Sequence, residues 1–264
     1  MNTRYPSRIV CLTEETTETL YLLGCGNAVV GISGFTMRPP EARSKPKVST
    51  FTEANFEKII SLRPDIVLTF SDVQADITRE LMLRGIQVVG FNQRCVGEIL
   101  QNILIIGSLV GKNNKAEDLV ATFEQNLETV KKAADTHSRR PRVYFEEWYD
   151  PLITCIRWVS ELVEIAGGTD VFADRSTSQS AKGRIVSSED VIVRNPEIII
   201  GSWCGKQFKP DQLYRRQGWD QITAIAGRRL FEVKSTIILQ PGPAALTDGL
   251  KELSRIIRSE VLTE

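Results

Sequence analysis

The chain has 264 residues, of which 42% are hydrophobic, enough for one large or two small globular domains with a sizeable core. Lys and Arg number 33 and Asp and Glu number 33, so the basic excess typical of nucleic-acid-binding proteins is absent and that class is excluded. The longest apolar run, residues 99–110, is interrupted by polar residues and too short to span a bilayer, so we expect no membrane insertion.

The start of the chain and its cysteines bear on the cellular compartment. Residues 1–8 contain no apolar export segment and lead directly into a predicted strand. We therefore expect the chain as it stands to be cytoplasmic, or periplasmic if an export signal has been removed. Five scattered cysteines without a CxxC motif favour a reducing compartment over a disulfide framework: Cys11, Cys25, Cys95, Cys155 and Cys204.

The first part of the chain alternates predicted strands with predicted helices. Strands are predicted at residues 8–12, 29–33, 65–70 and 87–91. Helices are predicted at residues 14–23, 55–62, 73–84 and 96–110, with an irregular loop at 34–52. This order predicts a mostly parallel sheet covered by helices.

A long amphipathic helix is predicted at residues 115–135. Its apolar residues recur at spacings of three and four and form one stripe: Ala116, Leu119, Val120, Phe123, Leu127 and Val130. No Gly or Pro interrupts the segment, and at 1.5 Å per residue it would be roughly 30 Å long. We interpret it as a rigid connection between two lobes.

The second part of the chain repeats the alternation. Strands are predicted at residues 142–148, 197–203 and 230–234, with a short one at 169–173. Helices are predicted at residues 159–166, 188–194, 218–226 and 244–261, with a loop at 175–183. The predicted domains are an N-terminal α/β lobe at 1–112, a linking helix at 113–137 and a C-terminal α/β lobe at 138–264.

An internal repeat relates the two lobes. Residues 56–68 align with residues 188–200. In both segments a Glu precedes a Pro by seven residues, an acidic residue follows that Pro, and three aliphatic residues come next. Two similar lobes joined by a helix predict a cleft between them, and clefts between domains hold ligands.

Several segments, taken in order, carry a resemblance to a known family. They are residues 8–20 (RIVCLTEETTETL), 55–68 (NFEKIISLRPDIVL), 143–152 (VYFEEWYDPL), 166–174 (AGGTDVFAD) and 241–243 (PGP). Together they resemble substrate-binding proteins of the cobalamin and iron-siderophore ABC transporters, the class III periplasmic binding proteins. The resemblance covers nearly the whole chain and implies two similar α/β lobes with mostly parallel sheets, joined by one long helix, with a ligand cleft between them.

The resemblance also implies function and partners. It implies a non-enzymatic receptor that needs no cofactor and binds a corrinoid or metal chelate as cargo. The partners would be this small molecule and an ABC permease or an intracellular acceptor, and we expect a monomer. Glu57 and Glu189 match the positions at which the family presents one acidic residue per lobe to the permease. The alternative is that both are solvated helix-terminal charges stabilised by the helix dipole.

Candidate ligand contacts follow the predicted strands, because open α/β sheets bind ligands beyond the carboxyl ends of their strands. Aromatic candidates for flat apolar walls are Phe35, Phe51, Phe70, Trp148 and Trp203, whose alternative role is core packing. Cationic candidates for carboxylate, phosphate or amide oxygens are Arg38, Arg94, Arg157 and Lys206. The remaining polar candidates are Glu15, Asp72, Glu147 and Gln240.

Metal binding and catalysis have weaker support in the sequence. Acidic residues at the strand ends and Cys204 match no metal-binding spacing, and the single histidine, His137, excludes His-rich metal sites and a Ser-His-Asp triad. No P-loop or GxGxxG motif is present. An acid–base role for Glu146 or Glu14 remains as an enzymatic alternative, although Glu146 and Glu147, as strand neighbours, would point to opposite faces.

Three readings remain open after the sequence. The leading hypothesis is a solute-binding protein for a corrinoid or metal chelate. The second is a cytoplasmic carrier or sensor of a smaller polar ligand, suggested by the arginines near the strand ends and the missing export segment. The third is a hydrolase that uses cleft carboxylates.

Overall fold

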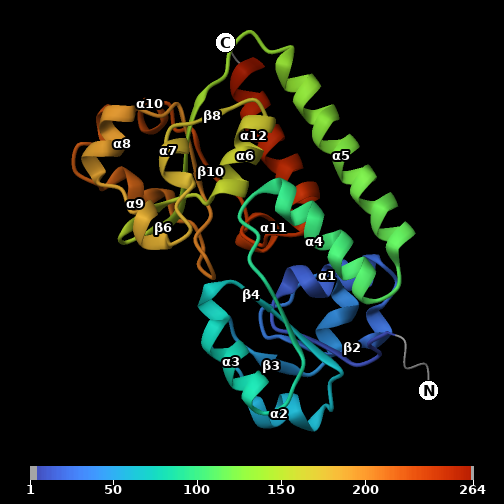
Figure 1. The fold of residues 1–264 in the computed structure, drawn as a ribbon. Coiled ribbons are helices and arrows are strands. Elements are labelled where there is room, and N and C mark those ends of the chain that lie inside the picture. The colour runs from blue at the N-terminus through green and yellow to red at the C-terminus, as the bar shows by residue number, and fades with distance from the viewer. Residues whose placement is uncertain (1–4, 263–264) are drawn as a thin grey trace. The chain divides into compact units, whose positions relative to one another are not determined.

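The computed structural model describes residues 5–262, which divide into two compact units. Within the described part, the N-terminal unit comprises residues 5–93 and 97–122, and the C-terminal unit comprises residues 94–96 and 123–262. Each unit is an α/β layer structure built on one sheet (Figure 1). The predicted α/β fold with two lobes and mostly parallel sheets is confirmed.

The N-terminal unit contains a five-stranded sheet. Its strands are β1 (Ile9–Cys11), β2 (Val29–Ser33), β3 (Lys47–Ser49), β4 (Ile66–Phe70) and β5 (Val88–Phe91). They run in the order β3-β2-β1-β4-β5, and every neighbouring pair is parallel. The strands alternate with α1 (Glu14–Leu22), α2 (Phe56–Ser61), α3 (Ala75–Leu83) and α4 (Val96–Leu109). Each predicted strand and helix of this part has its counterpart within a few residues.

Strand β3 lies inside the segment predicted as an irregular loop. It has three residues, and its Val48 is buried against the core of this unit. The amide of Ile32 donates to the carbonyl oxygen of Pro46 at 2.9 Å and brings this segment to the edge of β2. Because the strand is so short and follows a proline-rich stretch, hydrophobic alternation gives no signal for it.

The predicted long helix is confirmed as α5 (Asn113–Asp135), with 23 residues. Ala116, Val120, Phe123 and Leu127 of the predicted stripe are buried. The boundary between the two compact units falls inside this helix, between Thr122 and Phe123. The first part of α5 therefore packs with the N-terminal unit and the second part with the C-terminal unit, and the predicted domain ranges stay a prediction.

The C-terminal unit contains a second five-stranded sheet. Its strands are β6 (Arg142–Tyr149), β7 (Leu152–Thr154), β8 (Thr169–Asp170), β9 (Ile198–Gly201) and β10 (Leu230–Glu232). The order is β10-β9-β6-β7, and β8 also pairs with β6. All pairs are parallel except β6 with β7, which form an antiparallel hairpin around Pro151 that the sequence analysis missed.

Most helices of the C-terminal unit are short. They are α6 (Arg157–Ile165), α7 (Ala173–Ser176), α8 (Ser188–Arg194), α9 (Pro210–Tyr214), α10 (Thr223–Ala226), α11 (Ser235–Ile238) and α12 (Leu250–Leu262), with α6 and α12 as the longest among them. The helix predicted at 218–226 is split into a 3-10 turn and α10, and the last predicted helix begins with a π-helical turn at Ala245–Gly249. The loop predicted at 175–183 contains the end of α7.

The internal repeat is visible as the same helix–turn–strand unit in both sheets. Helix α2 leads into β4, and helix α8 leads into β9. The residue before each repeat proline, Arg63 or Asn195, has a left-handed backbone with φ of 46° or 41°. These residues end the helices and turn the chain into the following strand. The repeated sequence pattern thus corresponds to a repeated turn.

Within the described residues, none of the helices combines the length and the apolar character that crossing a membrane requires.

Candidate ligand-binding site at the strand ends

In the C-terminal unit, four aromatic side chains gather where two strands end. Strands β6 and β9 are adjacent and parallel, with Glu146 paired to Gly201, so their carboxyl ends reach the same edge. Ring centroids are 5.0 Å apart for Trp148 and Tyr149, and 4.5 Å apart for Tyr149 and Trp203. Phe208 lies 5.1 Å from Trp203 in an edge-to-face contact. We call Trp148, Tyr149, Trp203 and Phe208 the aromatic cluster.

The aromatic cluster has a buried floor and a partly exposed surface. Trp203 and Phe208 are 3% and 4% exposed and belong to the core, whereas Trp148 and Tyr149 are half-buried. Trp203 was predicted as a wall of the site; it is buried and its ring packs against that of Tyr149, and its contact with a ligand stays a prediction. Tyr149 was not among the predicted residues, although its position directly after Trp148 could have indicated it.

Lys206 lies over the exposed side of the aromatic cluster. Its Nζ donates to the Tyr149 hydroxyl at 2.8 Å and lies 5.0 Å and 5.2 Å from the ring centroids of Trp148 and Tyr149. A tight turn sets this position: the Lys206 amide donates to the Trp203 carbonyl oxygen, and Gly205 between them has φ of 68°. Left-handed backbone favours glycine, which explains the residue before the lysine.

An ion pair between the buried Glu146 and the partly exposed Arg216 supports the aromatic cluster. Glu146 is 0% exposed and accepts hydrogen bonds from both terminal nitrogens of Arg216, at 2.5 Å and 3.0 Å, and from the Trp203 indole at 3.0 Å. This geometry is a charge-assisted, bidentate contact, which fixes side chains in one orientation. The Glu146 carboxylate therefore has a structural role, because both of its oxygens bind neighbouring side chains. Its partner Arg216 is 70 residues away in sequence, and no sequence pattern pointed to it.

Glu147 points to a different arginine, as its position on the strand predicted. The buried Arg184 side chain donates to both Glu147 oxygens, at 2.5 Å and 3.2 Å, and to the Thr154 carbonyl oxygen at 2.6 Å. Neighbours on β6 therefore point to opposite faces. The predicted ligand contact at Glu147 stays a prediction, and the structure shows its carboxylate neutralised by Arg184.

In the N-terminal unit, two aromatic side chains after the strands are exposed. Phe35 follows β2 and is 50% exposed, and Phe51 follows β3 and is 36% exposed. Phe70, at the end of β4, is buried, and its ring centroid lies 6.5 Å from that of Phe51. Phe70 thus supports Phe51 much as Trp203 supports Tyr149 in the C-terminal unit.

Two of the four predicted cations are held by carboxylates within their own units. The Nε of Arg38 donates to Glu18 at 2.7 Å, and the Nε of Arg157 donates to Glu161 at 2.8 Å, one helical turn away. Two further predicted polar residues, Arg94 and Gln240, are half-buried. These pairings reduce the positive charge that the sequence suggested at the strand ends.

Two buried carboxyl groups follow the central strand β1. Burial is the main cause that raises the pKa of Glu14 to about 7 and that of Glu15 to about 8, in spite of a hydrogen bond from the Thr13 hydroxyl to Glu15 at 2.5 Å. Oε2 of each has no hydrogen-bond partner. The predicted Glu15 is therefore a buried group that holds its proton at neutral pH.

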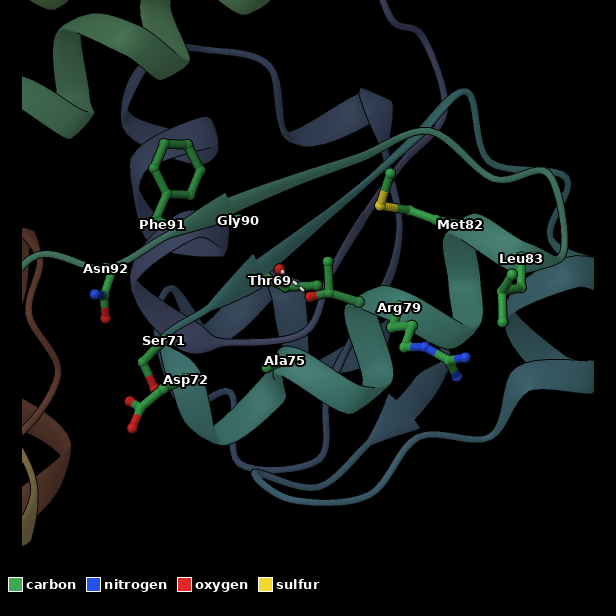
Figure 2. Close-up of a pocket in the computed structure, with 11 residues that line it drawn as sticks. Thr69, Ser71, Asp72, Ala75, Arg79, Met82, Leu83, Gly90, Phe91 and Asn92 are labelled. Carbon is green, nitrogen blue, oxygen red and sulfur yellow. Dashed lines mark hydrogen bonds between the residues drawn. The ribbon is translucent and has the colours of Figure 1, made fainter.

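A hollow of about 640 Å³ lies over β4 and β5 beside α3 in the N-terminal unit (Figure 2). Asp72 and Asn92, which follow these strands, lie at one end, and Met82 and Leu83 of α3 lie toward the other. Gly90 has no side chain to crowd this hollow, whereas a Cβ at this position would lie in a tight contact, 3.3 Å from the Thr69 hydroxyl oxygen. The predicted Asp72 thus lines a hollow of its own unit.

The two predicted docking glutamates differ in their surroundings. Glu57 is 85% exposed, and its Oε1 lies 3.1 Å from Arg84. Glu189 is exposed on the first turn of α8 and has no ion pair among the contacts of the described residues. It lines a hollow of about 550 Å³ with Arg216 and Gly218.

Among residues 5–262, no group of three or more His, Cys, Asp or Glu side chains is placed to hold a metal ion. His137 follows α5 and precedes β6, at the opposite end of that strand from Trp148. The acidic residues and Cys204 considered from the sequence are not brought together as ligands.

Comparisons with known proteins agree with this architecture. The periplasmic binding protein family matches residues 9–236. An uncharacterized ABC transporter substrate-binding lipoprotein of Bacillus subtilis is 29% identical over 269 residues, covering 98% of this chain and 82% of the relative. The vitamin B12-binding protein of Vibrio cholerae is 28% identical over 258 residues, covering 95% and 89%.

Solved structures show the same fold. A possible iron-binding (periplasmic solute-binding) protein of Staphylococcus epidermidis superposes with a TM-score of 0.83 at 25% identity, covering 96% of this chain and 99% of that one. Because the family match spans most of the sequence, the chain belongs to the periplasmic binding protein family. It is a solute-binding protein of the ABC-transporter class, with a small-molecule ligand and a permease as partners. The prediction that it is not an enzyme is confirmed, because this family binds substrates without catalysis.

Proposed function

We propose that the chain binds a metal chelate with a large flat ring, of the corrinoid class, at the carboxyl ends of its strands. The observation that carries this proposal is the aromatic cluster: Trp148 and Tyr149 are half-buried, lie 5.0 Å apart and rest on the buried Trp203. Aromatic rings supported from below offer a rigid apolar face at low entropic cost, which suits a macrocycle.

The N-terminal unit supports the same class of ligand. Phe35 and Phe51 expose apolar ring surface at the ends of β2 and β3, where isolated exposure would cost hydrophobic free energy. Phe51 is backed by the buried Phe70. Each unit therefore offers aromatic surface at its own strand ends, which suits a ligand with an apolar ring.

The position of the single histidine favours a chelate that brings its own metal ligands. Strand β6 begins at Arg142, which at 3.3 Å per residue lies roughly 20 Å from Trp148, and His137 precedes that beginning. An imidazole is therefore not at hand for a metal bound at the aromatic cluster. Corrinoids and siderophores hold their metal without a histidine from the receptor, and the names of the relatives, vitamin B12-binding and possible iron-binding, point the same way.

The other predicted residues take supporting roles in this proposal. Trp203, Phe70 and Glu147 orient neighbouring side chains, and Glu15 supplies a buried neutral acid behind β1. We propose that oxygen or amide groups of the ligand contact the predicted polar residues Arg38, Asp72, Arg94, Arg157 and Gln240.

We further propose that Glu57 and Glu189 dock the permease, which places the working protein outside the cytoplasmic membrane, as the lipoprotein relative suggests. Both residues are exposed in the first turn of equivalent helices, and both are followed by the repeat proline. Glu57→Arg and Glu189→Arg should each reduce ligand-stimulated ATP hydrolysis by the permease in proteoliposomes by tenfold or more. Glu53→Arg, an exposed change near α2, is the control; unaltered ATPase rates in both docking variants would contradict the proposal.

A spectroscopic titration tests the ligand. Purified protein is titrated with cyanocobalamin and dicyanocobinamide, following the visible corrin bands and tryptophan fluorescence. We expect binding with submillimolar Kd, weakened about tenfold in Trp148→Ala, because a ring-stacking contact contributes about 1 kcal/mol beyond its buried area. Tyr214→Ala changes an exposed aromatic residue of α9 and should leave affinity unchanged. If neither corrinoid binds, the proposal is refuted.

A further inference from the structure

We infer that the solute carries an acidic group, a carboxylate or a phosphate ester, and that Lys206 binds it beside the aromatic cluster. This inference rests on the proposed ligand site and specifies its chemistry. It starts from a third hollow, of about 340 Å³, at the carboxyl ends of β9 and β10. Its lining includes Trp203, Lys206, Glu232, Lys234, Ser235 and Thr236.

The hollow adjoins the proposed ring-binding surface through shared residues. Trp203 forms both its wall and the floor under Tyr149. Lys206 also belongs to both, because its side chain lines the hollow while its Nζ contacts the rings of Trp148 and Tyr149. A substituent on a ring lying over the aromatic cluster would therefore reach the hollow.

The charge of the hollow is positive, and its source is Lys206. Lys234 is neutralised by Glu232, with Nζ 2.6 Å from Oε2. Lys206 is exposed and has no carboxylate partner among the contacts of the described residues, which for this side chain are one hydroxyl and two rings. One net positive charge thus remains in a hollow that also contains the hydroxyl groups of Ser235 and Thr236.

Lys206 is held ready for an anion. An ammonium group has three donors, and one of them is used by the Tyr149 hydroxyl. The turn at Gly205 and the two aromatic faces restrict the side chain before any ligand arrives, which lowers the entropy lost on binding. The two remaining donors can bind the oxygens of a carboxylate or phosphate, with hydroxyl groups nearby to complete the contact.

Two matched pairs of chelates test this inference. Dicyanocobinamide phosphate carries a phosphate ester that dicyanocobinamide lacks, and iron protoporphyrin carries two carboxylates that its dimethyl ester lacks. We expect the wild-type protein to prefer the acidic member of a pair that it binds by about tenfold, and Lys206→Gln to abolish that preference while leaving the non-acidic member's Kd within about twofold. Lys206→Arg should keep the preference.

The control is Lys209→Gln, which removes an exposed charge from the same loop outside the hollow. Equal weakening of both members of a pair in Lys206→Gln would show a merely structural role and overturn the inference. Corrinoid binding without acid preference overturns the inference but keeps the proposed function. Binding of the porphyrin pair alone, with preference for the acid, refutes the corrinoid proposal but keeps the role of Lys206. A protein that binds none of the four contradicts both.

Discussion

Each unit buries a carboxyl group in or shortly after a strand of its sheet, and the two groups are stabilised in different ways. In the C-terminal unit, Glu146 of β6 is paired with Arg216 and the Trp203 indole. In the N-terminal unit, Glu15 follows β1, receives one hydroxyl hydrogen bond, and has a pKa raised by burial to about 8. A buried carboxyl can thus be kept charged by a cation or kept neutral by a proton.

The same contrast appears in the cores. The packed cluster of the N-terminal unit is aliphatic and contains residues such as Val10, Ile59 and Leu81. The corresponding cluster of the C-terminal unit contains five aromatic residues, Tyr144, Phe172, Trp203, Phe208 and Trp219. The aromatic core needs polar partners for its indoles, and the ion pair of Glu146 and Arg216 supplies one of them. The two clusters therefore differ in their content of aromatic side chains.

The largest expected effect on stability comes from breaking the ion pair between Glu146 and Arg216. Arg216→Met leaves the Glu146 charge buried without its cation and should lower the free energy of unfolding by about 3–5 kcal/mol. Urea unfolding followed by tryptophan fluorescence measures it. The double variant Glu146→Gln with Arg216→Met is the matched control and should recover part of the loss, because no charge is then buried. A single variant as stable as wild type would contradict the role assigned to this pair.

The next largest effect is the pH dependence of stability that the buried, protonated carboxyl group of Glu15 should cause. Glu15 has a folded pKa of about 8 and an ordinary value of 4.5, so the folded chain holds a proton that the unfolded chain releases between these limits. Stability should therefore be full below about pH 4.5 and fall as pH rises towards 8. Because one pKa unit corresponds to about 1.4 kcal/mol, the loss of stability across this interval is on the order of a few kcal/mol.

Glu15→Gln removes this titration and should make the dependence of Tm on pH between 5 and 8 shallower, while Glu14, whose pKa is also raised, keeps part of it. Glu53→Gln, an exposed change that removes the same formal charge, is the control and should follow the wild-type curve. Parallel curves for wild type and Glu15→Gln would show that Glu15 is ionised in the folded protein.

A smaller effect compares the caps of the repeated helices. The Asn55 side chain accepts from the amide of Lys58 at the start of α2, and Ser187 forms a reciprocal capping box with Asp190 at the start of α8. Asn55→Ala and Ser187→Ala should each cost about 1 kcal/mol, with the larger loss at Ser187 because two hydrogen bonds depend on it. Chemical denaturation of both variants decides the order, and a larger loss at Asn55 would contradict it.

The smallest effect concerns the two exposed glutamates. Glu57 has Arg84 at 3.1 Å, whereas no cation pairs with Glu189 among the described contacts. Exposed ion pairs contribute about 0–1 kcal/mol, so Glu57→Gln should cost less than about 0.5 kcal/mol and Glu189→Gln should cost nothing measurable. Thermal unfolding at low and high salt measures the difference, which should vanish in high salt. A loss above 1 kcal/mol at either position would show a structural role.

Much of the fold could be predicted because its signals are local. The apolar stripe of α5, the buried runs of β4 and β9, and the repeat around Pro64 and Pro196 each lie within a short window of sequence. The missed strands β3 and β7 have three residues each, too few for a hydrophobic period, and they pair through contacts set elsewhere in the chain.

The candidate site was harder to predict, because its geometry depends on distant residues. Sequence reasoning identified Trp148 and Lys206 by their places after strands, but it could not separate the buried Trp203 from the half-buried Trp148. It also missed Arg216, since nothing near that residue in sequence reveals Glu146. Side-chain pairing across 70 residues is decided by tertiary packing alone.

The left-handed residues before the two repeat prolines have a consequence for how this protein can change. Arg63 and Asn195 differ in size and charge, yet both adopt nearly the same torsion angle, so the halves share a backbone path more closely than they share side chains. Substitutions at positions 63 and 195 are therefore tolerated as long as the new residue can adopt the left-handed backbone conformation. A β-branched replacement at either position would strain that bend, whichever half it occurred in.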